Sequence, residues 1–501
     1  MYTKSDYDQI SVYDFILPFG GHLDEDNRWV KLRDTIDWKI IEEVYEKNFD
    51  NKKDGQEAYP AEVAFGALYI QRTLGCTDRE LVMQISENPY MQYFIGYKEY
   101  SKEKPFNPSL LVHFRKRLTD EMMSEITERM FLKDKNDDDS NGDSGSGGAR
   151  KQSLSETEDA DENRGTVIID ATCTPADIAF PTDLELCDKA RRWTEQIIDK
   201  LWDTHGIIEG VKKKPRTYRD KARKRFLSVN KRRKKSTKKI KKELRYQLNC
   251  IKRNLENIET YGLAVGYDAL SMTELDRLLT IYEFYDQQKY LLDHKTHSVP
   301  NRIVSLSQPW VRPIVRGKSK APTEFGAKLS IAVVDGYTII DKISFDSYNE
   351  GDHREFVAAI ENYKERFGYY PKRVLADKIY RSQANRNYCK ERGIKISGPR
   401  LGRPGKNRPE EIRQELREIG ERNAVEGKFG NGKRKLGLGR IMAKLKETTG
   451  SMIAMDLFVL NMEYHMRKCV TLCYAIIEML FKGDKVVDEN RKSVLTIMLV
   501  A

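Results

Sequence analysis

The stretch GTVIIDATCTP, residues 165–175, decides how the central part of this chain folds. Its first apolar residues are mostly β-branched, which predicts a short buried strand over Thr166–Ile169 that ends at Asp170. A carboxylate at the carboxyl end of a buried strand indicates a functional site, because charges are rarely placed near a core without a specific reason. Asp170 is therefore the first candidate catalytic residue.

Two further carboxylates lie at comparable places later in the sequence. Arg373–Ala376 predicts a short strand that ends at Asp377, and Glu426 lies in a helical stretch after the last predicted strand. The carboxyl ends of neighbouring strands in an α/β sheet converge at the crevice where ligands bind. Hard oxygen ligands there suit Mg²⁺ or Mn²⁺, and two such ions about 3.5–4 Å apart can serve phosphodiester transfer. We therefore expect Asp170, Asp377 and Glu426 to lie in one pocket and to bind two ions.

Two cations accompany the third carboxylate in the stretch ERNAVEGKFGNGKRK, residues 421–435. Arg422 lies four residues before Glu426 and Lys433 lies seven residues after it, so a helix would place all three side chains on one face. Such a face suits a site where a metal ion meets a phosphate. The three glycines of the stretch argue against a regular helix as far as Lys433. A solvated helix end with mixed charge is the alternative interpretation.

The pattern around these carboxylates predicts an α/β core. Leu329–Val334 and Tyr337–Phe345 are expected to form two hairpin strands joined by the turn Asp335-Gly336, which accounts for Asp335 structurally. A helix is predicted over His353–Phe367, followed by a strand, a helix, a short strand and a last helix. With a helical insertion after the first strand, this order is that of a ribonuclease-H-like core. We assign residues 165–467 to this catalytic domain.

The insertion, residues 183–300, carries an unusually dense run of positive charge. From Lys212 to Arg245, 19 of 34 residues are Lys or Arg, and only Asp220 and Glu243 oppose them. Since these charges repel one another, a polyanion is the expected partner, and the binding should weaken steeply with salt. The apolar spacing after this run predicts a helical hairpin, whose second helix begins with the capping pair Ser271 and Glu274. The residues of the run expected to bind DNA are Arg232, Arg233, Lys234 and Lys235.

Other cations are candidates for contact with a DNA backbone. Lys378 and Arg381 follow Asp377, where they could hold a phosphate or could be exposed residues at a helix start. Arg312, Arg316 and Lys318 precede the hairpin strands and could follow the backbone of a DNA strand.

The two ends of the chain differ from the core. Residues 1–132 predict a helical domain, which could bind DNA in the manner of a helix-turn-helix protein or could serve docking or dimerisation. Residues 133–164 are acidic and lack large apolar residues, which predicts a disordered linker. Residues 468–501 are expected to form a C-terminal helix and tail, in which the apolar run Cys469–Phe481 packs but is too short to span a bilayer.

Composition is consistent with a cytoplasmic protein. The seven cysteines lack a CxxC or a Cys/His ligand pattern, and the first residues do not resemble a signal peptide. The formal net charge of +11 is modest, but its clustering favours a nucleic-acid partner. We expect no membrane association, and the family resemblance given next implies a bacterial protein associated with the nucleoid.

Six stretches in combination resemble the DDE transposases of bacterial insertion sequences. They are IIDATCTPADIAFPTD, QPWVRPIVRGK, EFGAKLSIAVVDGY, VLADKIYRS, ISGPRLGRP and RNAVEGKFGNGKRK. The resemblance covers about Gly165 to Arg467, and the helical N-terminal segment also looks like the leading domain of such transposases.

The resemblance implies a role for each candidate residue. Asp170, Asp377 and Glu426 match the catalytic triad that binds the divalent metals, while Arg422 and Lys433 match the cations around the acidic residue that contact DNA at the cleavage site. The family signature has a tyrosine three residues before the arginine, and here Ile419 stands in its place. The implied activity is cleavage of double-stranded DNA at the element's ends and joining to target DNA, by a homodimer on DNA. A ribonuclease-H-like nuclease without strand transfer and a catalytically inactive DNA-binding derivative are the alternatives.

Overall fold

The computed structural model describes residues 11–17, 20–49, 57–132, 163–234, 236–315, 323–399 and 408–480, with only the backbone of 473–480. Some of the expectations lie partly or wholly outside these residues. They concern nearly all of the acidic linker, the DNA-binding candidates Lys235, Arg316 and Lys318, and the tail that follows residue 480.

The N-terminal region is helical, as the sequence predicts. Thr77 and Thr119 each accept a backbone N–H bond at a helix start, and Gly75, at φ 65°, ends a helix in the left-handed conformation. Arg115 of this region is buried and donates to Gln71 and Asp78. The helices are α1 (Arg28–Thr35), α2 (Trp38–Glu46), α3 (Ala61–Leu74), α4 (Asp78–Glu87), α5 (Pro89–Phe94), α6 (Leu110–Arg117) and α7 (Asp120–Phe131).

A mixed six-stranded sheet forms the centre of the described chain. Its strands are β1 (Thr166–Pro175), β2 (Arg312–Val315), β3 (Thr323–Val334), β4 (Tyr337–Ser344), β5 (Arg373–Leu375) and β6 (Lys395–Ile396). One edge of β3 pairs with β1, and its other edge pairs with β4 and β2 in turn. On the far side of β1, the parallel strands β5 and β6 follow. The central β1 is therefore antiparallel to β3 and parallel to β5.

The expectation that the first strand ends at Asp170 is wrong. β1 continues to Pro175, because its antiparallel pairing with β3 extends from Val167–Val334 to Pro175–Gly326. The pairing with β5 stops much earlier, at Ile168–Leu375. Asp170 thus lies within a strand, at the point where only one of its two neighbouring strands continues.

The elements that follow the hairpin agree with the sequence pattern. Asp335 and Gly336 both have positive φ, 52° and 86°, as a two-residue hairpin turn requires. Beyond the hairpin lie α13 (His353–Phe367), the 3₁₀ turn η1 (Lys378–Tyr380), α14 (Gln383–Glu391) and α15 (Arg408–Asn431). The α-helix gives way at Gly432 to a π-helical turn, η2 (Gly432–Leu436), so Lys433 is not on a continuous α-helix with Glu426.

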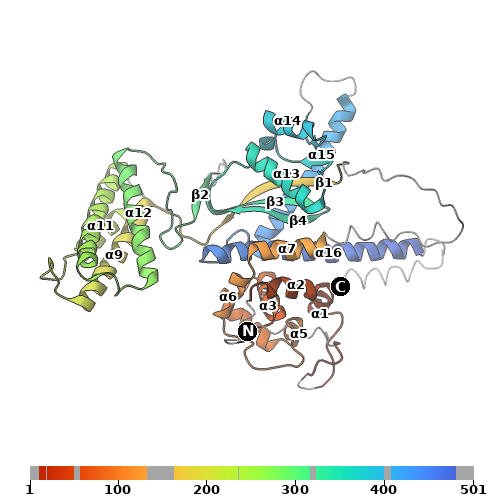
Figure 1. The fold of residues 1–501 in the computed structure, drawn as a ribbon, viewed down its shortest axis with the longest axis horizontal. Coiled ribbons are helices and arrows are strands. Elements are labelled where there is room, and N and C mark those ends of the chain that lie inside the picture. The colour runs from red at the N-terminus through yellow and green to blue at the C-terminus, as the bar shows by residue number, and fades with distance from the viewer. Residues whose placement is uncertain are drawn as a thin grey trace.

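The insertion between β1 and β2 is a separate helical bundle. Its helices are α9 (Asp183–His205), α10 (Arg219–Asn230), α11 (Thr237–Val265) and α12 (Met272–Asp293). The predicted capping pair is present, since Ser271 and Glu274 bond reciprocally at the start of α12. The bundle has its own apolar core and stands to one side of the sheet (Figure 1). It contains two more helices than the predicted hairpin.

One long helix, α16 (Lys446–Leu480), joins the N-terminal helices to the sheet. It lies between them in Figure 1, with α13, α14 and α15 on the opposite side of the sheet. Its buried part is Thr448–Met462, and Asn461 bonds both the N–H and the C=O of Thr338 on β4. The expected packing from Cys469 onward is wrong for the side chains described, because Val470 and Leu472 are exposed. Within the described residues, no helix is long and apolar enough to cross a membrane.

Candidate active site

Asp170 lies within β1, and Asp377 lies just after the neighbouring parallel strand β5. The last register pair between these strands joins Ile168 to Leu375; Asp170 lies two residues after Ile168, and Asp377 lies two residues after Leu375. The Asp377 charge acts on the Asp170 carboxyl, so the two side chains lie near one another. Asp377 is the N-cap of η1 and accepts the Lys378 N–H at 2.7 Å, while Asp170 accepts the Ala171 N–H at 2.8 Å.

Asp170 is the more buried of the two, and its pKa is influenced by the charges of Asp377, Glu426 and Arg422. Burial raises the pKa of its carboxyl, and the negative charges of Asp377 and Glu426 raise it further. The Ala171 N–H and the Arg422 guanidinium act in the opposite direction. The structure therefore brings Asp170, Asp377, Glu426 and Arg422 within electrostatic range of one another.

Helix α15 is held over the ends of the strands by two ion pairs. The Arg373 guanidinium of β5 contacts Glu421 at 3.0 Å, and Lys395 of β6 contacts the buried Glu418 at 3.0 Å. Further along the helix, Val425 and Phe429 are buried in the core. Since glycines inside a helix cost about 1 kcal/mol each relative to alanine, this anchoring compensates for the glycines of α15.

The anchored helix presents Arg422 and Glu426 at the site. Their side chains lie one turn apart, with 3.9 Å between Arg422 Nη2 and Glu426 Oε1, and Glu426 is 64% exposed. The predicted shared face is therefore present for these two residues. Lys433 follows in the π-helical turn and is partly buried.

A cavity of about 170 Å³ opens beside Asp377. Arg422 and Ile419 line it from α15, while Lys378 and Arg381 line it from the segment after β5. Ile419 thus lies at the site, in the place where the family signature has tyrosine. Arg381 is less available than expected, because its Nη2 donates to Pro399 O at 2.6 Å and its Nε is buried.

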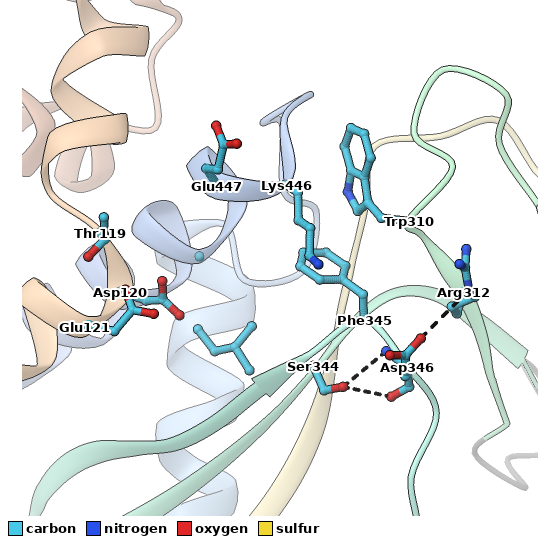
Figure 2. Close-up of a pocket in the computed structure, with 12 residues that line it drawn as sticks. Thr119, Asp120, Glu121, Trp310, Arg312, Ser344, Phe345, Asp346, Lys446 and Glu447 are labelled. Carbon is cyan, nitrogen blue, oxygen red and sulfur yellow. Dashed lines mark hydrogen bonds and ion pairs between the residues drawn. The ribbon is translucent and has the colours of Figure 1, made fainter. Parts of the chain in front are cut away.

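Arg312 lies in a different cavity, of about 600 Å³, which is bounded by α7, α16 and the end of β4. Figure 2 shows its side chain directed toward Asp346, with 3.9 Å between Arg312 Nε and Asp346 Oδ1. Its Nη1 also donates to the carbonyl oxygens of Pro309 and Val311. The structure does not bring this candidate together with the carboxylates.

The basic residues of the insertion also lie away from the carboxylates. Arg232, Arg233 and Lys234 are exposed in the connection between α10 and α11, at a bundle that stands beside the sheet (Figure 1). Among the contacts described for this connection, Arg232 Nε donates to Ser228 O at 2.9 Å. These residues can form a separate cationic surface, but they are not part of the carboxylate site.

Tyr380 also lies at the site, although no sequence pattern indicated it. Its side chain is 2% exposed, and within the described part of the chain its hydroxyl has no hydrogen-bond partner. Burial raises its pKa, with the Asp170 charge as the next cause. An aromatic residue one turn after Asp377 was the available signal, but only the 3₁₀ turn shows that it points inward.

The donor set is chemically suited to a hard divalent cation. Asp170, Asp377 and Glu426 supply carboxylate oxygens, and the pKa of Asp170 is raised first by burial and then by the negative charges of the other two, which a bound cation would offset. In the conformation described, however, no three acidic, histidine or cysteine side chains of the described residues are close enough to bind one ion. Binding therefore requires side-chain movement, for which the exposed Glu426 has room.

Comparisons with known proteins identify two segments of the chain. Residues 374–463 match the family model described as Transposase DDE domain, and residues 18–117 match the model described as Transposase domain (DUF772). A protein of Rhizobium meliloti described as "Uncharacterized protein ORF8 in nfe locus" is 27% identical over 178 residues, which are 36% of this chain and 74% of that protein. No solved structure matches the chain.

The two family matches confirm the resemblance to DDE transposases of insertion sequences. The segments that resemble transposase domains lie in a helical N-terminal region and in a mixed α/β domain. Such a family implies DNA as the substrate.

Proposed function

We propose that this transposase cleaves the ends of an insertion sequence and joins the freed 3′-hydroxyl to target DNA, with a ribonuclease-H-like core as its catalytic domain. The observation that carries the proposal is that Asp170 and Asp377 each lie two residues past the last pair of the parallel strands β1 and β5, with Glu426 and Arg422 of α15 in electrostatic range of Asp170. The clustered carboxylates would repel the negatively charged phosphodiester of a DNA substrate. A bound cation would remove this repulsion.

Asp170, Asp377 and Glu426 would hold two Mg²⁺ or Mn²⁺ ions. When bound, such ions activate the attacking oxygen and stabilise the leaving oxygen in phosphodiester transfer. The protein's own part is to position the carboxylates and the DNA. Arg422 and Lys433, with Lys378 beside Asp377, would bind phosphates at the cleavage site.

The remaining regions would bind the DNA around the reaction. We assign DNA contact to the exposed Arg232, Arg233 and Lys234 of the insertion and to the N-terminal helices. Two element ends must be processed together, so we propose that a homodimer assembles on the DNA.

The test is Mg²⁺-dependent cleavage of DNA that carries the element's ends by the Asp377→Asn chain. We expect cleavage to fall at least a thousandfold while DNA binding persists, because one ligand oxygen loses its charge and the backbone is unchanged. Glu415→Gln is the matched control, since Glu415 lines the same cavity but is not assigned to the ions. Retained cleavage by the Asp377→Asn chain would refute the assignment.

A joining assay with pre-cut ends tests the second half of the proposal. Joining of those ends to a target plasmid supports strand transfer. Cleavage without joining would instead assign the chain to nucleases that lack strand transfer.

A further inference from the structure

A buried arginine links the N-terminal helices to η2, the π-helical turn that follows α15. Arg72, in the last turn of α3, is 7% exposed and donates from Nε and Nη2 to the two carboxylate oxygens of Asp456, at 2.5 and 2.7 Å. Asp456 is on α16 and is fully buried. A paired arrangement of this kind fixes the orientation of a guanidinium, because both partners are excluded from water and the contact is two-pronged.

The same guanidinium makes a third contact, with the π-helical turn that contains Lys433. Arg72 Nη2 donates to Leu436 O, the last carbonyl of η2, at 2.5 Å. A helix end leaves such carbonyls without intrahelical partners, so an external donor determines where the turn ends. The next residue, Gly437, has φ 101°, and a Cβ there would lie 2.5 Å from Arg72 Nη2.

Close packing on the other side leaves the turn little freedom. A Cβ on Gly432 would lie 2.5 Å from Leu438 Cδ1 and 3.3 Å from Leu460 Cδ1 of α16. Leu438 N also donates to Gly432 O at 3.1 Å, which closes the turn on itself. Arg72 therefore contacts the last residue of η2, and this turn packs against both α3 and α16.

We propose that Arg72 is a positioning residue of the transposase, which holds η2 so that Lys433 stays in register with Glu426. This inference rests on the proposed function, in which Lys433 binds DNA at the cleavage site. It gives the N-terminal helices a second role as part of the support of the active site. A change in their docking on α16 would then be transmitted to Lys433 through one side chain.

The positioning itself is tested by hydrogen exchange in the full chain carrying Arg72→Lys. A lysine can contact Asp456 but cannot donate to Asp456 and Leu436 in the same fork geometry. We expect the amides of residues 432–438 to exchange at least tenfold faster, while those of α13 are unchanged. Arg366→Lys is the matched control, because Arg366 also joins the N-terminal helices to the core, through Glu128 and Asp341, without contact to η2. Unchanged exchange at 432–438 in the Arg72→Lys chain would overturn the proposal.

The consequence for activity is tested with a double variant. If Arg72 acts through Lys433, the chain with Arg72→Lys and Lys433→Ala should cleave no more slowly than the chain with Lys433→Ala alone. Multiplied losses would overturn the proposal, as would a normal rate for Arg72→Lys. Should Arg72→Lys fail to fold, Gly437→Ala perturbs the Arg72 Nη2 contact while both Arg72 and Asp456 are kept. If the parent chain does not cleave DNA, the proposed function fails, whereas exchange still decides whether Arg72 holds the turn.

Discussion

Arg422 and Glu426 lie one turn apart on α15, with 3.9 Å between guanidinium and carboxylate, and the Arg422 charge also reaches Asp170. Arg422 is therefore the cation that offsets negative charge on both the sheet and the helix. The ion pair with Glu426 is partly exposed and contributes little to stability by itself. The contribution of Arg422 to the site is electrostatic, because its positive charge lowers the pKa of Asp170 whereas burial raises that pKa.

This relationship predicts the pH dependence of an Arg422→Gln variant. Loss of the guanidinium removes an influence that lowers the pKa of Asp170, so that pKa rises further above its ordinary value. Asp170 must be ionised to bind a cation, so the pH below which cleavage is lost should be higher in the variant than in the parent chain. We expect the acidic limb of the pH profile of cleavage at saturating Mg²⁺ to move to higher pH in the variant. The measurement is the rate of cleavage at saturating Mg²⁺ at several pH values.

The control for this prediction is Arg417→Gln. Arg417 is exposed on the same helix and carries the same charge, but it is not among the groups that influence Asp170. Its pH profile of cleavage should match that of the parent chain. Equal behaviour of the two variants would contradict the electrostatic role of Arg422.

The sequence pattern locates the carboxylates well, because strand periodicity and residue spacing are local properties. The β-branched run before Asp170 and the short run before Asp377 both form strands, and the register then brings the aspartates together. The pattern does not show that β1 continues to Pro175. That length depends on pairing with β3, which lies more than a hundred residues away in the sequence.

The cationic run of the insertion predicts a salt-dependent term in DNA binding. Each phosphate contact contributes about −0.9 to the slope of log K against log salt. Changing Arg232, Arg233 and Lys234 to Gln should therefore make this slope less negative by up to about 3, with a similar loss for any DNA sequence. The measurement is DNA affinity at several salt concentrations for an end sequence and an unrelated sequence.

The matched control changes the net charge by the same amount elsewhere. Lys39, Lys252 and Lys289 are exposed on α2, α11 and α12, outside the connection between α10 and α11. Their replacement by Gln should leave the slope nearly unchanged. If both triple variants lose the same slope, binding follows net charge rather than this surface.

The tertiary roles of Arg72 and Arg115 could not be predicted, because neither has a local signal. Each arginine follows an apolar helical pattern in which a charged residue is ordinarily placed toward solvent. Arg115 is buried against Asp78, and Arg72 is buried against Asp456, 384 residues later in the chain. The docking of α16 brings Asp456 to Arg72, whereas the packing of the N-terminal helices on one another brings Asp78 to Arg115.

The cap of α12 supplies a prediction about stability and pH. Lys200 and the cap residue Ser271 donate to Glu274, and these contacts lower its pKa to about 2. Because the pKa of the folded state is below the ordinary value, the stabilisation is fully present above about pH 4.5 and is lost as pH falls toward 2. Glu274→Gln should destabilise α12 by about 1 kcal/mol at pH 7, the usual cost of a lost helix cap, and by less at pH 3. Hydrogen exchange of the α12 amides, compared with the parent chain at each pH, measures the difference.

The control is Asp276→Asn, which removes an exposed charge two residues after Glu274 and should show no such pH dependence. A difference that stays constant from pH 7 to pH 3 would mean that the carboxylate charge of Glu274 does not stabilise the cap.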